Sequence, residues 1–393
     1  MNQFLPRLIA WEVTRSCMLN CLHCRAAARY GRDPNELSTD ECFRFLDDVK
    51  SFSDPIIILT GGEPMLREDI FDLAEYGTKK LSLRMVMAPC GMLITEESAR
   101  RLKDAGIKRI SLSLDGAIAE THDTFRGVRG SYANVLQAMG YARKVGLEFQ
   151  VNTTVTKHNL KELPEILQLA REKGAVAFHP FLLVPTGRGK DLAEWEISPE
   201  DYEKTLTWIY EKDKELQLSR LRSIASATER GKTFQFKPTC APHYYRIYHQ
   251  QEARLRPDIR RDLGGQVKKT NSLIHQFTNS LSPSLHSLTK GCMGGQYFAF
   301  ISHTGKVQIC GFLELECGDI RKEPFSQIWQ TSKIFKEMRD WDNYHGRCGT
   351  CEFRKVCGGC RARAYALTGD YLAEEPYCIY QPKTRITADE SRG

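Results

Sequence analysis

Six short apolar runs recur between residues 8 and 184 of the chain, and amphipathic segments separate most of them. The runs are LIAWEVT (8–14), PIIILT (55–60), LRMVMA (83–88), RISLSL (109–114), FQVNTTV (149–155) and AFHPFLLV (177–184). In the first amphipathic segment, apolar residues from Cys42 to Val49 share one helical face, and Ser38 with Glu41 predicts a capping box. Strands that alternate with helices form parallel sheets. The pattern therefore predicts an α/β fold, a partial (β/α)6 barrel with its functional groups at the carboxyl ends of the strands.

The composition is that of a globular chain, with 393 residues of which 41% are hydrophobic and 27% are charged. No apolar run approaches the ~20 residues that span a bilayer, and no secretion signal opens the sequence, so we expect a cytoplasmic protein. The net charge of +7 fits an acidic substrate, but no basic stripe with aromatic residues indicates nucleic acid. In a reducing compartment, metal binding is the default interpretation for clustered members of the 14 cysteines.

We expect three parts in the chain. The partial barrel occupies residues 1–215 and ends with a helix near 198–216. Residues 216–290 form a linker or insertion with possible substrate contacts, and the stretch from about 246 to 290 lacks periodicity and predicts a loop. Residues 291–393 form a cysteine-rich domain with strands at YFAFIS and KVQICGF and a helix near 325–339.

Three cysteines, Cys17, Cys21 and Cys24, follow the first predicted strand at C-x3-C-x2-C spacing. A [4Fe–4S] cube usually takes four cysteines, so three leave one iron open for an exogenous ligand. This arrangement resembles the radical S-adenosylmethionine (SAM) superfamily, in which the open iron chelates the amino and carboxylate groups of SAM. In that family the reduced cluster cleaves the cofactor to a 5′-deoxyadenosyl radical. Taken alone, the three cysteines also fit zinc or chance.

Further residues match the resemblance. The turn after the second strand contains two glycines, which let the backbone approach a ligand closely, and in the family it binds the SAM amino group. It consists of Thr60, Gly61, Gly62, Glu63 and Pro64. The family pattern also places Ser113 and Arg126 at the SAM carboxylate, and Asn152 with the 185–189 turn near its ribose and adenine. Each of these features, taken alone, also fits a polar strand end or an ordinary turn.

A second group of cysteines lies near the carboxyl end of the chain. Its C-x2-C-x5-C-x2-C block alone suggests zinc, but with the flanking cysteines it resembles the SPASM extension of radical SAM enzymes, which houses auxiliary [4Fe–4S] clusters. The resemblance implies one complete cluster on Cys348, Cys351, Cys357 and Cys378, and a second on Cys292, Cys310 and Cys360 whose fourth ligand is unassigned. The commonest SPASM pattern has three residues, not two, before its last paired cysteine. The assignment of Cys360 as a ligand is therefore left open.

The remaining cysteines lie outside these two spaced groups. We interpret Cys42 and Cys90 as small buried hydrophobic residues and leave Cys317 uncommitted. Cys240 differs because it lies in the unusual block KPTCAPHYYR.

The blocks VMAPCG, FHPFLLVPTGRG and KPTCAPHYYR extend the resemblance, almost end to end, to the heme b synthases of the siroheme-dependent heme pathway in anaerobic bacteria and archaea. The resemblance implies that two propionates of iron-coproporphyrin III, a tetrapyrrole, become vinyl groups and give heme b. The radical would take a hydrogen from the propionate β-carbon, and loss of CO2 and one electron would leave the alkene. An auxiliary cluster could accept that electron, and a flavodoxin- or ferredoxin-type partner would act as electron donor.

An anionic tetrapyrrole needs cations and flat apolar walls, and one aromatic and basic segment offers both. Its residues His243, Tyr244, Tyr245 and Arg246 are the candidate substrate contacts. The aromatic core face of an amphipathic helix explains them equally well. His179 or His303 could bind the iron axially, although a lone histidine is weak evidence.

Three other functions stay open. A sibling enzyme acting on a siroheme derivative, in heme d1 formation or at another step, has the same cysteine pattern. A SPASM peptide maturase is disfavoured, because the first strand begins near residue 8 and leaves no room for a leader-binding domain. An iron–sulfur electron carrier would have no need for the GGEP turn, Ser113 and Arg126.

Overall fold

The structure is a computed structural model that describes residues 4–225, 234–262 and 290–382. Within these residues one sheet holds ten strands in the order β10-β9-β8-β1-β2-β3-β4-β5-β6-β7. The strands are β1 (Leu8–Thr14), β2 (Ile56–Gly61), β3 (Arg84–Met87), β4 (Ile110–Ser113), β5 (Phe149–Val155), β6 (Ala177–Leu182), β7 (Gln235–Phe236), β8 (Phe298–Ile301), β9 (Lys306–Gln308) and β10 (Gly318–Asp319). Strands β1 to β8 pair in parallel, and β9 and β10 are antiparallel.

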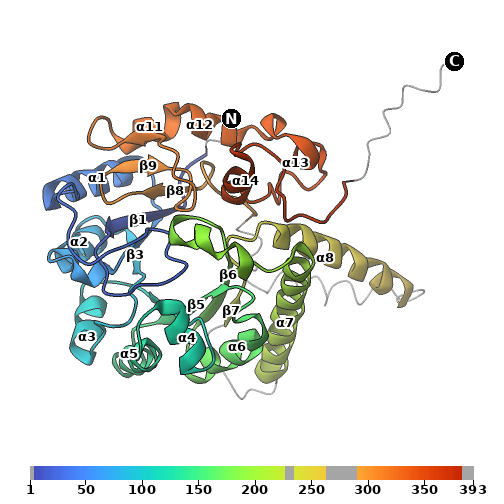
Figure 1. Cartoon of the computed structure of the whole chain (residues 1–393), viewed down its shortest axis with the longest axis horizontal. Helices are drawn as coiled ribbons and strands as arrows, with labels where there is room; N and C mark the ends of the chain where they lie inside the picture. The colour runs from blue at the N-terminus through green and yellow to red at the C-terminus, as the bar shows by residue number, and fades with distance from the viewer. Residues whose placement is uncertain (1–3, 226–233, 263–289, 383–393) are drawn as a thin grey trace.

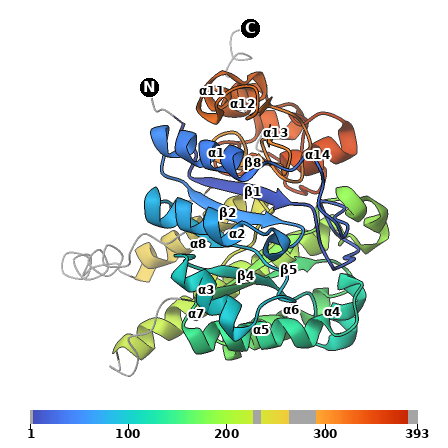
Figure 2. The same ribbon diagram turned by 90° about the vertical axis from the view of Figure 1, so that its left-hand side faces the viewer.

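Helices cover the outer side of this sheet, and the carboxyl-terminal elements lie beside β8 and β1 (Figure 1). Figure 2 shows α1, α2 and α3 packed along the sheet from a second direction. The helices are α1 (Thr39–Phe52), α2 (Ile70–Glu75), α3 (Glu96–Asp104), α4 (Ala119–Arg126), α5 (Ser131–Val145), α6 (Leu163–Glu172), α7 (Pro199–Ala225), α8 (His243–Asp262), α11 (Phe325–Thr331), α12 (Lys333–Arg339), α13 (Gly346–Thr350) and α14 (Arg361–Thr368).

Helix α1 begins where the sequence predicts it. The hydroxyl of Ser38 accepts a hydrogen bond from the Glu41 amide (3.3 Å), and the Glu41 carboxylate accepts one from the Ser38 amide (2.8 Å). This capping box satisfies two amides that the first helical turn leaves without partners. The predicted apolar face, Cys42, Phe45 and the residues to Val49, is buried against the sheet. The cap and the face together fix how α1 crosses from β1 to β2.

The prediction of an α/β partial barrel followed by a cysteine-rich domain is confirmed. All six predicted strands form, and the two edges of the sheet, β10 and β7, do not pair with each other, so the barrel is open. The strands of the carboxyl-terminal region also join this sheet, because β8 pairs in parallel with β1 from Leu8 to Trp11. The cysteine-rich domain is therefore attached next to the strand that leads into the first cysteine group.

Three sequence predictions differ from the structure. The expected loop from about 246 is helix α8 up to Asp262, and the rest, residues 263–289, lies outside the described residues. Tyr244 and Ile247 are buried in α8, which packs on α7, while Arg246 and the many polar and charged residues after Ile247 hide the period. The predicted helix near 325–339 is two helices that meet at Ser332, and α7 continues to Ala225. No helix in the described ranges is long and apolar enough to cross a bilayer.

Candidate functional site

The first cysteine group forms a loop directly after β1. Cys17 and Cys21 are buried and Cys24 is half-buried. The amide of Leu19 donates to Sγ of Cys17 and the amide of Ala28 donates to Sγ of Cys24, both at 3.4 Å. Such N–H···S contacts favour thiolates and are typical of cysteines that bind iron–sulfur clusters. The three thiols therefore suit a cluster ligand set.

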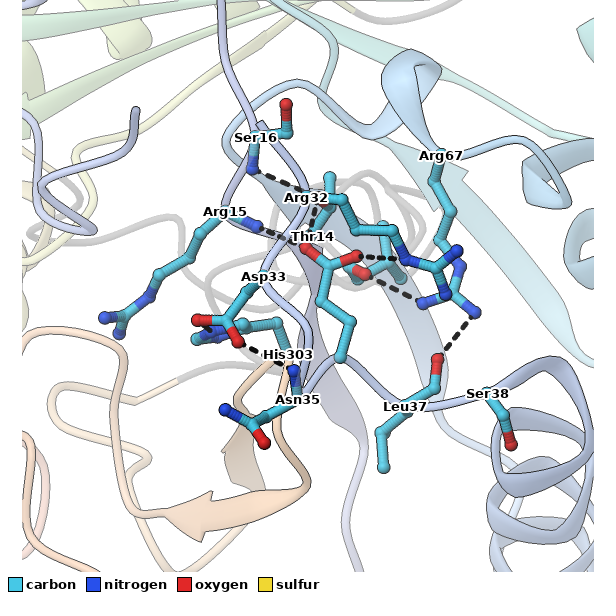
Figure 3. Close-up of polar contacts among 12 residues, drawn as sticks. Thr14, Arg15, Ser16, Arg32, Asp33, Asn35, Leu37, Ser38, Arg67 and His303 are labelled. Carbon is cyan, nitrogen blue, oxygen red and sulfur yellow. Dashed lines mark hydrogen bonds and ion pairs between the residues drawn. The ribbon is translucent and has the colours of Figure 1, made fainter. Parts of the chain in front are cut away.

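A network of polar side chains holds the start of this loop (Figure 3). The buried Glu36 carboxylate accepts hydrogen bonds from the Thr14 hydroxyl (2.6 Å) and the Arg15 amide (3.2 Å). The Thr14 hydroxyl in turn accepts a hydrogen bond from the Ser16 amide (3.0 Å). Arg67 donates to the carbonyls of Val13 (3.0 Å) and Leu37. These hydrogen bonds within the protein therefore hold the backbone that leads into Cys17 without a contribution from a cofactor.

The glycines of the second motif pack against this loop. Gly61 has a φ of +147°, and a Cβ there would lie 2.1 Å from the carbonyl oxygen of Thr14. A Cβ on Gly62 would lie 2.3 Å from the carbonyl oxygen of Ser16. The sequence predicts a close approach of these glycines to a ligand, and the structure shows their close approach to the end of β1. Thr60 and Pro64 flank the pair, at the end of β2 and at the start of a short 3-10 helix, Pro64–Leu66.

Glu63 holds the next loop in place. Its side chain is fully buried and accepts hydrogen bonds from the amides of Met65 (2.9 Å) and Cys90 (2.6 Å). Burial raises the pKa of Glu63. Cys90 lies beside Met18 of the cysteine loop, so the GGEP turn ties β1, β2 and the segment after β3 together.

Arg126 lies against the cysteine loop at the end of α4. Its Nη2 is 2.6 Å from the carboxylate of Asp115, and its Nη1 is 3.6 Å from Sγ of Cys21. Burial disfavours its charge, but the Asp115 carboxylate and the thiols of Cys21 and Cys90 together raise the pKa of Arg126. The Nε atom has no hydrogen-bond partner, so one donor is left for a ligand. The sequence alone did not single out Asp115, although this residue lies in the segment SLDG (113–116) at the end of β4.

The 185–189 turn closes over the cysteine loop from the other side. Arg188 donates from Nε to the carbonyl of Cys21 (2.9 Å) and from Nη1 to the carbonyl of Ala28 (2.8 Å). A Cβ on Gly187 would lie 2.2 Å from the carbonyl oxygen of Arg25. A hollow of about 410 Å³ lies along the loop and includes Cys17 and Arg188 in its lining. The turn therefore fastens the loop, and its role toward ribose and adenine stays a prediction.

A row of polar side chains crosses the concave face of the sheet. Buried and half-buried residues alternate along β5, and the half-buried ones, with Asn152 among them, face the side that the helices leave open. Register places Ser113, Asn152 and His179 side by side on β4, β5 and β6. Phe178 pairs with Phe236, so the following residues, His179 and Lys237, are also neighbours.

The far end of this row has unused donors. Gln150 donates from Nε2 to Oδ1 of Asn152 (3.0 Å) and lies 3.2 Å from Nδ1 of His179. With Nδ1 as the acceptor, Nε2 of His179 carries the proton, and this atom has no hydrogen-bond partner. Burial lowers the pKa of Lys237 to about 8, and no carboxylate pairs with it among the described residues.

The first carboxyl-terminal cysteine set lines one hollow. Amides of Phe353, Gly359 and Glu375 each donate to a thiol of this set at 3.4 Å, as in the first loop. The set consists of Cys348, Cys351, Cys357 and Cys378. No three Cys, His, Asp or Glu side chains in the described part of the chain are placed to hold a single metal ion.

Helix α8 brings two of the expected substrate contacts to that hollow. His243 and Arg246 are buried in its lining. His243 Nε2 lies 2.7 Å from the Glu375 carboxylate, and although burial opposes its charge, this carboxylate raises the pKa of His243 to about 9. Arg246 donates to the Glu203 carboxylate (2.9 Å). The structure thus places these two beside the auxiliary cysteines and not in the row that ends at Lys237.

The other two expected contacts lie in the same helix. Tyr244 is fully buried and Tyr245 is half-buried against the core, which agrees with the aromatic core face that the sequence also allowed. His303 contacts the Glu12 carboxylate (2.8 Å) and is therefore occupied by a partner.

The second carboxyl-terminal set, Cys292, Cys310 and Cys360, lies next to the first. The amide of Cys292 donates to the carbonyl of Cys357 (2.9 Å). The amide of Phe312 donates to Sγ of Cys310 (3.4 Å). Arg25, which follows Cys24, donates to the carbonyl of Gly311 (3.3 Å). This set therefore lies between the first cysteine loop and the other auxiliary set.

Comparisons with known proteins agree with this arrangement. Residues 11–170 match the family described as the radical SAM superfamily, and residues 292–352 match SPASM, an iron–sulfur cluster-binding domain. The solved structure of Streptococcus suis SuiB bound to precursor peptide SuiA has a TM-score of 0.66, with 16% identity over 96% of this chain and 76% of that one. That likeness shows the fold.

Two relatives are similar over almost their whole length. The AdoMet-dependent heme synthase of Methanosarcina barkeri is 47% identical over 96% of this chain and 97% of its own. The Fe-coproporphyrin III synthase of the same organism is 29% identical over 96% of this chain and 89% of its own. The fold and both domains define a radical SAM enzyme with a SPASM extension. Within that superfamily the chain belongs to the family that contains the Methanosarcina barkeri AdoMet-dependent heme synthase.

The predicted cofactors follow from this membership. The radical SAM domain uses SAM and a [4Fe–4S] cluster, and the SPASM domain holds auxiliary iron–sulfur clusters. The residues fit these groups, since three thiols share one loop, Nη1 of Arg126 lies 3.6 Å from Sγ of Cys21, and Nε of Arg126 has no partner among the described residues. We propose Cys17, Cys21 and Cys24 as the ligands of the radical SAM cluster. Thr60 to Pro64, Ser113, Arg126 and Asn152 remain the proposed SAM contacts.

Proposed function

We propose that this protein is a heme b synthase, which converts two propionates of iron-coproporphyrin III to vinyl groups. The observation that carries the proposal is the 47% identity, over 96% of this chain and 97% of the relative, to the AdoMet-dependent heme synthase of Methanosarcina barkeri. Family membership alone leaves the substrate open, because radical SAM folds support many reactions. The chemistry of the barrel interior therefore has to be consistent with an anionic substrate.

The row on the concave face offers that chemistry. Lys237 is half-buried and has no carboxylate partner in the described residues, and the neighbouring His179 has a buried Nε2 donor without a partner there. Leaving a buried donor unpaired costs free energy, which a carboxylate ligand would recover. Ser113 and Asn152 continue the row toward the mouth where SAM is proposed to bind. We propose that Lys237 and His179 hold a substrate carboxylate within reach of the site of hydrogen abstraction.

The reaction balances for each propionate. SAM and its cluster supply a 5′-deoxyadenosyl radical, which takes one hydrogen atom from the β-carbon. The bond between the α-carbon and the carboxylate then breaks, CO2 leaves, and one electron departs as the carbon–carbon double bond forms. An auxiliary cluster is the proposed acceptor of that electron. The chain's own task is to hold the carboxylate and to keep the β-carbon facing SAM.

The experiment is an anaerobic assay with reconstituted protein, SAM, iron-coproporphyrin III and a chemical reductant in place of the proposed flavodoxin- or ferredoxin-type donor. We expect two successive losses of CO2 and two hydrogens by mass, each with formation of 5′-deoxyadenosine. A Cys21→Ala variant is the matched control and should form neither product. Formation of deoxyadenosine by the unaltered protein without any change in the porphyrin would overturn the proposed substrate.

A second candidate is a neighbouring reaction on a related tetrapyrrole. The Fe-coproporphyrin III synthase of Methanosarcina barkeri favours this candidate over a peptide substrate, because its 29% identity exceeds the 26% identity of the mycofactocin maturase of Mycobacterium ulcerans. The same assay with the siroheme-derived precursor in place of iron-coproporphyrin III separates the two. Conversion of that precursor alone would move the proposal to the sibling reaction.

A further inference from the structure

Cys240 lies where the end of the barrel sheet meets the SPASM domain. It follows β7 in the chain, and the amide of its neighbour Thr239 donates to the carbonyl of Pro180 on β6 (2.7 Å). The hydroxyl of Tyr202 lies 3.4 Å from the carbonyl oxygen of Cys240. Cys240 has a φ of +55°, in the left-handed region that side chains other than glycine rarely adopt. Strained backbone of this kind gathers at functional sites.

Cys240 lies near the start of α14, where Cys360 is the N-cap residue, because Arg363 of that helix donates to the Tyr202 hydroxyl (3.4 Å) that contacts the Cys240 carbonyl. A negative charge on Cys240 would be opposed by Cys310, Cys360 and Cys292, and Arg363 is the cation that faces it. Cys310 in turn has Cys292 and Cys360 as neighbours, and Cys360 has Cys292. A Cβ on Gly358, two residues before Cys360, would lie 3.9 Å from the Cβ of Cys292. Four cysteines from four separate parts of the chain therefore converge on one place.

We propose that Cys240 is the fourth thiolate of the auxiliary [4Fe–4S] cluster held by Cys292, Cys310 and Cys360. A cube has four irons, and these three cysteines alone would leave one of them without a protein ligand. The four thiols meet at the junction of the two domains, so the proposed cluster joins the barrel to the SPASM domain. The proposal depends on the SPASM assignment and not on the identity of the substrate.

The other unassigned cysteines do not compete for this position. Cys42 is buried beside Arg67 (3.4 Å) under α1. Cys90 lies next to Met18 in the first cysteine loop. Cys317 contacts the carbonyl of Leu315. Cys317 is therefore a suitable control, since it lies in the SPASM domain without facing the proposed cluster.

The test uses the full chain with Cys17, Cys21 and Cys24 changed to alanine, so that the open iron of the radical SAM cluster is absent. Cys240→Gly is the main variant, because glycine adopts a positive φ freely and the change removes the thiol without adding strain. Cys240→Ser keeps the size of the side chain and tests the result independently. Iron and sulfide content and the electron paramagnetic resonance spectrum of the reduced protein are measured with and without imidazole.

With Cys240 present, we expect a spectrum that imidazole does not alter. In the Cys240 variants we expect either about four fewer irons per chain or a spectrum that shifts when imidazole binds the exposed iron. Cys317→Ala should match the parent protein. Unchanged iron content and spectrum in both Cys240 variants would overturn the proposal, and so would a parent spectrum that already responds to imidazole. Loss of porphyrin conversion alone would not count as support.

Discussion

Lys237 is the residue whose protonation we expect to control substrate binding. Burial lowers its pKa to about 8 and lowers the pKa of its neighbour His179 to about 3, so His179 is neutral and Lys237 carries the charge. Arg109 is the other cation near His179, and it pairs with Glu148 (3.3 Å). Lys237 is protonated below about pH 8 and neutral above it. The value of kcat/KM for the porphyrin should therefore fall as the pH rises through about 8.

Matched variants of Lys237 separate charge from packing. Lys237→Arg keeps its charge at every working pH, so the alkaline fall in kcat/KM should disappear. Lys237→Met should raise KM about 10-fold at neutral pH, through loss of one charge-assisted contact. The measurement is the pH profile of porphyrin conversion at saturating SAM. Identical alkaline limbs in the unaltered protein and Lys237→Arg would contradict the assignment.

Arg188 is a residue whose effect should reach the cluster through the backbone. It donates to the carbonyls of Cys21 and Ala28, on either side of Cys24. Arg188→Ala removes both hydrogen bonds, so the loop should open more often and lose iron several-fold faster to a chelator. Arg188→Lys can reach only one of the two carbonyls and should be intermediate. If the chelator abolished SAM cleavage at the same rate in all three proteins, the loop would not need this contact.

The turn at the end of β2 has no room for a side chain larger than that of glycine. Gly61→Ala would place a Cβ 2.1 Å from the Thr14 carbonyl oxygen at a φ of +147°. We expect it to lower the free energy of unfolding by about 2 kcal/mol and to weaken cluster retention, because β1 and β2 must separate. Gly140→Ala, in α5 with open space around it, is the control and should be neutral or stabilising. Thermal unfolding of both variants checks this, and equal melting temperatures would contradict it.

Some strands and helices can be predicted from their own residues alone, whereas others depend on contacts with distant parts of the chain. Strands β1 and β5 have the bounds that the sequence predicts, because their apolar runs and alternation are complete within each segment. Helix α8 was predicted as loop because its stability comes from distant partners. Arg246 is neutralised by Glu203 on α7, a pairing that no local period reveals. Its charged residues therefore looked solvated in the sequence.

The candidate site divides in the same way. Spacing alone was enough to find the first cysteine group and the C-x2-C pairs. It could not place Cys240, which has no cysteine nearby in the chain and meets its neighbours only through the fold. It also could not show that Gly61 fits against Thr14, since a glycine next to a ligand and one next to a strand look alike in sequence.

In the whole molecule, the cysteine sets are arranged in one direction from the barrel to the SPASM domain. Arg25 follows the loop of Cys17, Cys21 and Cys24 and donates to the carbonyl of Gly311, beside Cys310 of the second auxiliary set. Arg25 also pairs with Glu12 of β1 (2.8 Å). The Cys292 amide then connects that set to the first auxiliary set through the Cys357 carbonyl. Both contacts end on backbone carbonyls, and both are formed by the fold of the chain itself. If clusters are held by these sets as proposed, an electron released at the barrel mouth would meet the second auxiliary set before the first.

This order predicts that SAM cleavage and product formation can be separated. A Cys348→Ala, Cys351→Ala double variant removes two proposed ligands of the first auxiliary cluster and leaves the barrel unchanged. We expect 5′-deoxyadenosine to form still, while vinyl product falls steeply, because the second auxiliary cluster, once reduced, has no further cluster to pass the electron to. In the unaltered protein each vinyl group should accompany one deoxyadenosine, and this ratio of deoxyadenosine to vinyl group should rise sharply in the variant. Cys317→Ala should keep the normal ratio, and a normal ratio in the double variant would show that the electron leaves by another route.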